Sequence, residues 1–238
     1  MTAAEDFLRR SFAYRKLESA GASFQEHSNG ALATQFGDPA VEVDLARKLG
    51  LIDLSPVSRC GFKGKGTMEW LQKQGVAVPE ESNRAQRQAG NELAARLAPT
   101  EILILGDPLA SGGGLAESLP AAWASEAVPP KTPRGFPLPR QDSHAWFLVT
   151  GEHAATMFAK ICGVDLRPAK FPDLSIAQTS VARINAVVIR DDRHGEPAYH
   201  LLFDSASAHY LWDCLIDAME EFCGAPVGLA ALKALWGG

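Results

Sequence analysis

The chain has 238 residues, of which 46% are hydrophobic and 21% are charged, and this balance is typical of a globular protein rather than a disordered one. The formal net charge of −5 argues against a nucleic-acid-binding face, because such a face is usually basic. No run approaches the ~18 uninterrupted apolar residues of a membrane span. The N-terminus also lacks the apolar segment of a signal peptide, so we expect a cytoplasmic protein without membrane or nucleic-acid partners.

The start of the chain is predicted to be helical. Residues 1–40 read as an N-terminal helical extension, with a polar helix over 3–19. Apolar residues then recur every four positions over 41–49 and Gly50 follows, which predicts a helix that ends at this glycine. The short apolar run 51–55 predicts a strand.

Two segments in the middle of the chain resemble each other. Residues 64–71 and 151–158 each begin with a glycine and continue with helical periodicity. Each is followed by a strand-like run and a second helix, at 101–105 and 115–123 in the first copy and at 199–203 and 206–222 in the second. The sequence therefore favours an α+β fold with a weak internal duplication of a strand–helix–strand–strand–helix kind. A chance similarity between two amphipathic helices is the alternative.

A proline-rich segment separates the two copies. Residues 124–142 contain five prolines, which predicts an extended linker on the surface. We therefore predict a first half at 41–123 and a second half, with a C-terminal helix, at 143–238. Within the second half, the β-branched run 181–189 predicts a strand, and Ser205 is placed to cap the last helix.

A phosphate-binding loop is the first candidate for a functional site. Residues 61–67 are rich in glycine, contain two lysines and lead into a predicted helix, and helix N-termini attract anions. A Walker A loop needs four residues between its first glycine and its Gly-Lys-Ser/Thr end, whereas only two separate Gly61 from Gly64. A tight turn with solvated lysines is therefore the favoured interpretation.

Metal and hydrolase sites are not indicated. The six histidines lack i, i+4 spacing and the four cysteines form no Cys-x-x-Cys pair, so we expect no metal site and four free thiols. No Gly-x-Ser-x-Gly elbow occurs. The paired carboxylates Asp191 and Asp192 lie in the segment 190–195, whose composition is typical of a solvated hairpin. A surface turn is therefore favoured over a general acid or base.

Several segments resemble a known family. Residues 43–55 resemble the early part of the aminomethyltransferase (glycine-cleavage T protein) superfamily, where an Ala-Gly-Leu-x-Asp-x-Ser run precedes a glycine-led helix. In the second half, four segments resemble the gamma subunit of tetrameric sarcosine oxidase and of N-methylglutamate dehydrogenase, at 161–166, 171–172, 177–183 and 205–212. The resemblance covers roughly residues 40–223.

The resemblance implies both a fold and a role. The fold would consist of two pseudo-symmetric ferredoxin-like halves forming an aminomethyltransferase-type folate-binding domain. The partners would be the alpha and beta subunits of a flavin-dependent amine oxidase complex, which hold FAD, FMN and NAD. Such a complex oxidises sarcosine and passes the one-carbon unit to tetrahydrofolate. The gamma chain is not assigned the oxidation, so the resemblance implies a structural subunit without catalytic residues of its own.

The resemblance also suggests where a pterin would be contacted. Gly195-Glu196 with Tyr199 is similar to the superfamily's Gly-Glu-x-Gly-Tyr/Phe, whose glutamate accepts hydrogen bonds from the pterin ring. With Arg183, Glu196 and Tyr199 are the candidate tetrahydrofolate-binding residues. The superfamily's acidic pair is missing from 96–101, where only Glu101 remains. The alternative role is a free-standing tetrahydrofolate-dependent aminomethyl or methyl transferase, or a folate-binding scaffold protein.

Overall fold

The structure is a computed structural model that describes residues 4–27, 30–110, 112–126 and 132–237. Contacts divide the chain into two compact units. Unit 1 comprises Met1–Pro56 and His144–Gly238, and unit 2 comprises Val57–Ser143. Both units combine helices with sheets, so the predicted α+β class is confirmed. The boundaries differ from those of the predicted halves, because residues 41–56 belong to unit 1.

The N-terminal segment contains a small sheet instead of the predicted helical extension. Strands β1 (Arg9–Arg10), β2 (Ser23–His27) and β3 (Gly30–Gln35) pair in the order β1-β3-β2. The helix predicted over 3–19 is reduced to a 3-10 turn (Ala4–Asp6) and the short helix α1 (Tyr14–Ser19), and residue 3 lies outside the described residues. Phe24 and Leu32 are buried on the paired strands, and this burial favours the sheet over a longer polar helix.

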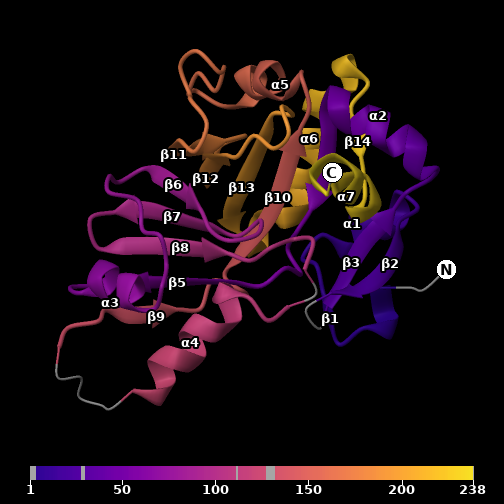
Figure 1. Ribbon diagram of the computed structural model, residues 1–238. Coiled ribbons are helices and arrows are strands. Elements are labelled where there is room, and N and C mark those ends of the chain that lie inside the picture. The colour runs from indigo at the N-terminus through magenta and orange to yellow at the C-terminus, as the bar shows by residue number, and fades with distance from the viewer. Residues whose placement is uncertain (1–3, 28–29, 111, 127–131, 238) are drawn as a thin grey trace. The chain divides into compact units, whose positions relative to one another are not determined.

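Unit 1 is built on a six-stranded sheet in the order β11-β12-β13-β10-β4-β14 (Figure 1). Its further elements are α2 (Pro39–Leu49), β4 (Gly50–Asp53), β10 (His144–Thr150), α5 (Ala154–Ile161), β11 (Ile176–Val181), β12 (Ile184–Arg190), β13 (Ala198–Asp204), α6 (Ala208–Met219), β14 (Ala225–Pro226) and α7 (Leu229–Trp236). The predicted apolar face of α6 is buried in the core, where Phe147 packs edge-on against Phe203 and Trp212. The 3-10 turn Ser205–Ser207 that leads into α6 is capped by Asp204, which accepts a hydrogen bond from the Ala206 N–H, and not by Ser205 as predicted.

A buried carboxylate joins distant parts of unit 1. Glu42 of α2 accepts hydrogen bonds from three backbone N–H groups, those of Phe36 (2.6 Å), Gly37 (2.8 Å) and Gly228 (2.7 Å). Gly228 is the N-cap of α7. Because the carboxylate of Glu42 is buried and the Gly228 N–H would otherwise be unpaired in the core, Glu42 fixes the start of α7 against the turn that precedes α2.

Unit 2 is built on a five-stranded sheet in the order β6-β7-β8-β5-β9. Its elements are β5 (Arg59–Lys63), α3 (Thr67–Lys73), β6 (Arg84–Arg87), β7 (Leu93–Ala98), β8 (Glu101–Leu105), α4 (Leu115–Ser125) and β9 (Phe136–Leu138). Strand β9 lies inside the predicted linker 124–142, so part of this segment pairs with β5. Its Pro137 is tolerated because β9 is an edge strand. Residues 127–131 of the predicted linker lie outside the described residues.

The two units repeat one order of elements. Unit 2 contains strand β5, helix α3, strands β6 to β8 and helix α4, and unit 1 contains β10, α5, β11 to β13 and α6. The sheet orders correspond, since β6-β7-β8-β5 matches β11-β12-β13-β10. Gly64 and Gly151 follow the first strand of each copy with positive φ, +124° and +108°. The repeat therefore has one strand more than the sequence predicted. Within the described ranges, no helix has the length and apolar composition to cross a membrane.

Candidate functional site

The predicted pterin-contacting residue Glu196 lies in a tight turn between β12 and β13 of unit 1. Arg193 and Glu196 exchange backbone hydrogen bonds of 3.1 and 2.9 Å. His194 and Gly195 lie between them with φ of +52° and +86°, the left-handed region that a two-residue hairpin turn requires. The Glu196 side chain is 26% exposed, and its Oε1 lies 3.5 Å from Nε of Arg47 on α2. The turn thus presents a carboxylate that a single arginine holds from one side.

The base of this turn is a buried charged network and not the solvated hairpin that the sequence predicted. Asp191 is 0% exposed, and its Oδ2 accepts a hydrogen bond from Nε of Arg193 at 2.8 Å. His200 Nε2 lies 3.4 Å from the same oxygen. Burial opposes ionisation of Asp191, but the hydrogen bonds from His200 and Arg193 and the positive charge of Arg193 outweigh it and lower its pKa. Asp191 is therefore a buried, compensated carboxylate.

His200 is held by both of its ring nitrogens. The Trp146 indole N–H donates to Nδ1 of His200 at 3.1 Å. An indole N–H is only a donor, so Nδ1 is the acceptor and the ring proton of neutral His200 lies on Nε2, toward Asp191. The Trp236 ring lies 6.1 Å from the imidazole. His200 is 2% exposed, so the chain Trp146–His200–Asp191 orders the core and has no free imidazole nitrogen for acid–base chemistry.

The neighbouring charges pair within the same segment. Arg190 donates to both carboxylate oxygens of Asp192, from Nε at 2.9 Å and from a terminal nitrogen at 2.5 Å, and its other terminal nitrogen donates to the Phe171 carbonyl at 2.6 Å. Such a two-bond pair fixes the geometry of both side chains. The four charges of 190–193 therefore hold the hairpin base in place and thereby position the turn that carries Glu196.

The structure does not bring the three predicted site residues together. Tyr199 is 0% exposed, and its hydroxyl donates to the Leu166 carbonyl at 2.9 Å. Burial raises the pKa of Tyr199 to about 12. Arg183 is exposed in the β11–β12 turn, at the opposite end of β12 from Glu196, and this turn interrupts the strand predicted over 181–189. Of the three, Glu196 has a partly exposed carboxylate at the predicted motif. Its contact with tetrahydrofolate stays a prediction.

The other candidates from the sequence have structural roles. A Cβ at Gly66 would lie 2.0 Å from the Pro133 carbonyl oxygen, so this glycine permits close packing of the turn into α3. Glu101 lies 2.7 Å from both Lys63 and Arg140, which compensate its charge. In the part of the chain that the structure describes, no group of three or more His, Cys, Asp or Glu side chains could hold a metal ion. The four cysteines are free thiols, as predicted, and burial raises the pKa of Cys60 to about 12.

Known proteins are similar to this chain in fold and in part of its sequence. Residues 121–236 match the family described as the GCVT N-terminal domain. A chain of the heterotetrameric sarcosine oxidase from Corynebacterium sp. U-96 is 22% identical, with a TM-score of 0.64, and the match covers 93% of this chain and 100% of that one. The glycine cleavage system aminomethyltransferase T from Bartonella henselae is 18% identical, with a TM-score of 0.73.

The extent of these matches differs. This chain spans 62% of the length of the Bartonella aminomethyltransferase, although the match covers 96% of this chain. Among curated proteins none matches the sequence. The chain shares the fold of these two proteins, and the resemblance to the aminomethyltransferase superfamily and to sarcosine oxidase that its sequence predicted is confirmed.

Proposed function

We propose that this chain is a gamma-subunit-like, non-catalytic component of a heterotetrameric sarcosine oxidase, or of a related complex that oxidises N-methyl amino acids and passes one-carbon units to tetrahydrofolate. The main support for the proposal is the extent of the structural match to a sarcosine oxidase chain. The match spans 93% of this chain and 100% of the sarcosine oxidase chain, so the two have nearly the same extent. In this role the alpha and beta subunits would be its partners and would hold FAD, FMN and NAD.

The contacts of the acidic and basic side chains support a role without chemistry of its own. Both ring nitrogens of His200 are engaged, and Asp191 is compensated by Arg193. Glu101, which remains where the superfamily has an acidic pair, is held between two cations. A general acid or base must reach a substrate proton, and these groups are occupied by the protein itself. The repeated order of elements supports two pseudo-symmetric ferredoxin-like halves.

A free-standing tetrahydrofolate-dependent aminomethyl or methyl transferase is the second candidate. It is favoured by the TM-score of 0.73 to an aminomethyltransferase and by the partly exposed carboxylate of Glu196. A carboxylate accepts two parallel hydrogen bonds from adjacent N–H groups such as those of a pterin. In this candidate Glu196 would bind the pterin directly. Tyr199 lies in the core and Arg183 lies in a separate turn, so neither would contact the pterin beside Glu196.

Purification of the tagged chain from its native cells tests the first proposal. We expect it to elute with stoichiometric flavin-bearing subunits and with sarcosine-dependent reduction of that flavin, while the isolated chain shows neither. A chain that elutes as a monomer without flavoprotein would refute the subunit role.

Calorimetry of the isolated chain with tetrahydrofolate tests the second candidate. If Glu196 contacts the pterin, Glu196→Gln loses a charge-assisted bond and weakens binding by roughly tenfold or more. The exposed Glu81→Gln is the matched control and should leave binding unchanged. Absence of any binding heat in the wild-type chain would remove this candidate.

A further inference from the structure

The two units differ at one edge of their sheets. The first strand of each copy, β10 or β5, has a further antiparallel strand beside it, β4 in unit 1 and β9 in unit 2. Unit 1 then continues with β14, whereas β9 is the last strand of its sheet in the described part of unit 2 (Figure 1). The internal repeat therefore indicates a strand position beside β9 that the described chain leaves open.

The glycines after the first strands bring the two edges into register. Gly64 directly follows β5 and Gly151 directly follows β10, both with positive φ. The residues before these glycines therefore correspond, and they pair with Phe136 of β9 and Gly50 of β4. Phe136 and Gly50 thus occupy equivalent positions in the two units.

The next residue of each strand provides a backbone acceptor. In unit 1 the Leu51 carbonyl accepts a hydrogen bond of 3.0 Å from the Val227 N–H, directly after β14. Its equivalent Pro137 pairs with Phe62. Because proline has no N–H, this pair cannot exchange two hydrogen bonds, so the Pro137 carbonyl points away from β5. No group of the described residues donates to it, and the acceptor that β14 uses in unit 1 is thus open in unit 2.

A large aromatic side chain stands beside this open acceptor. Phe136 is 69% exposed, and its ring centroid lies 6.5 Å from that of Trp123 on α4. By contrast, all four residues of β4 are buried. Strand β9 has no charged residue. An exposed aromatic side chain on an uncharged edge is typical of an anchor in a protein–protein interface.

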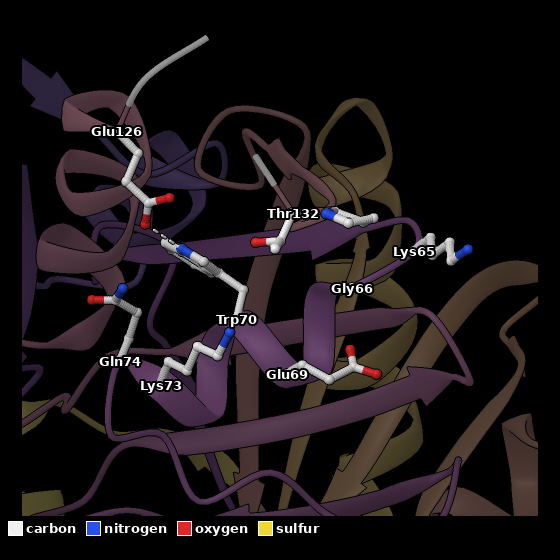
Figure 2. Close-up of a pocket in the computed structure, with 9 residues that line it drawn as sticks. Lys65, Gly66, Glu69, Trp70, Lys73, Gln74, Glu126 and Thr132 are labelled. Atoms are coloured by element: carbon white, nitrogen blue, oxygen red, sulfur yellow. Dashed lines mark hydrogen bonds between the residues drawn. The ribbon is translucent and has the colours of Figure 1, made fainter. Parts of the chain in front are cut away.

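The edge is held in place by close backbone packing. A Cβ at Gly66 would lie 2.0 Å from the Pro133 carbonyl oxygen, and the Gly135 N–H donates to the Lys65 carbonyl at 3.0 Å. Figure 2 shows Lys65 and Gly66 of this turn and Thr132 of the docked segment. Because the segment that leads into β9 is fixed on the turn before α3, little ordering of this edge is needed when a partner binds.

We propose that an extended segment of another protein chain adds a strand beside β9 and covers Phe136. One of its N–H groups binds the Pro137 carbonyl, as the Val227 N–H binds its equivalent in unit 1. The segment is apolar and uncharged, like residues 225–227. The inference rests on the proposed function for the identity of this chain, which is a flavin-bearing subunit of the complex.

The side chains of unit 1 also specify the size of one residue in the partner segment. A Cβ at Gly50 would lie 2.9 Å from a methyl carbon of Val227, so in unit 1 the side chain belongs to the added strand and the glycine to the sheet. In unit 2 the sheet supplies Phe136 at this position. The partner therefore has a small residue, glycine or alanine, opposite Phe136.

Cross-linking in the complex purified from native cells tests this contact. The photoreactive residue p-benzoylphenylalanine in place of Phe136 should cross-link to the flavin-bearing subunit. Mass spectrometry should place the cross-link in an apolar, uncharged stretch of that subunit. A cross-link only to other proteins, or to a charged stretch, would overturn the proposal.

Substitution of the anchor gives a second measurement. Phe136→Ser should lower the recovery of the flavin-bearing subunit roughly tenfold or more, because it removes a buried aromatic contact. Leu8→Ser is the matched control, since Leu8 is a 97% exposed apolar side chain in unit 1, and recovery should stay as in wild type. Both isolated variants should unfold at the temperature of the wild-type chain, because both side chains are exposed.

The two proposals fail in different ways. Unchanged recovery with Phe136→Ser would overturn this interface and leave the subunit role standing. A wild-type chain that recovers no flavoprotein would refute the subunit role and this interface together.

Discussion

Replacing Asp191 by asparagine tests whether the buried network holds the hairpin that carries Glu196. The substitution keeps the shape of the side chain and removes its charge. It weakens the charge-assisted bond from Arg193 and leaves this cation, whose side chain is 11% exposed, without its carboxylate. Loss of one partner of a buried pair costs up to 3–5 kcal/mol. Arg193 also lies 5.4 Å from the Trp236 ring centroid, which retains part of its stabilisation, so we expect a loss of about 2–3 kcal/mol at neutral pH.

The pH dependence of this loss gives a second measurement. The pKa of Asp191 is lowered in the folded protein. Its carboxylate therefore stabilises the fold above the ordinary pKa of aspartate, about 4, and this contribution is lost as the pH falls through the lowered value. The difference between wild type and Asp191→Asn should be complete at neutral pH and should shrink below about pH 4.

Urea unfolding followed by circular dichroism, at neutral pH and at the lowest pH where wild type stays folded, measures both effects. Asp213→Asn is the matched control, because Asp213 forms an exposed ion pair with Lys16 and should cost less than about 1 kcal/mol. A neutral-pH loss below about 0.5 kcal/mol, or a loss that does not change with pH, would refute the assignment of Asp191 as a compensated buried charge.

Two further predictions concern buried hydrogen bonds. Tyr199→Phe should lower the free energy of unfolding by about 1–2 kcal/mol, because it leaves the Leu166 carbonyl without its donor, and it should not alter tetrahydrofolate binding. Calorimetry and thermal unfolding measure the two effects. Weaker binding at unchanged stability would show instead that this residue contacts the ligand. Glu42→Gln should cost about 2–4 kcal/mol, because its amide NH₂ would face a backbone N–H donor. Glu81→Gln, on the surface, should stay within about 0.5 kcal/mol in the same denaturation experiment, and equal effects of the two would contradict this account.

Elements with a clear helical stripe were predictable from the sequence. Apart from the helix predicted over 3–19, the predicted helices correspond to α2, α3, α4, α5 and α6. The predicted strands near 51–55, 101–105 and 199–203 correspond to β4, β8 and β13. The strand predicted over 181–189 corresponds largely to β12. The hairpins β2–β3 and β6–β7 and the strand β11 were missed, in part because their strands carry polar side chains on exposed sides. Local periodicity also cannot show that β4 pairs with β10 and β14, which lie far away in the sequence.

Of the candidate site around Glu196, only the turn itself was predictable from the sequence. The motif around Glu196 was located correctly in a hairpin, because Gly195 adopts the left-handed conformation that the turn needs. The burial of Asp191 was missed, since a run of four charges is normally solvated. Only the three-dimensional contacts with Arg193 and His200 show how its charge is compensated.

The discontinuity of unit 1 has a consequence for the order in which the protein can fold. Strand β4 is made early, but both of its neighbours in the sheet, β10 and β14, are synthesised after the whole of unit 2. Unit 2 is one continuous stretch and can therefore complete its sheet on the ribosome. The early strand must wait for β10 until unit 2 has been made, and its second edge stays unpaired until β14 at residues 225–226 emerges. Truncation of the C-terminus by a few dozen residues should therefore release an aggregation-prone chain rather than a smaller folded protein.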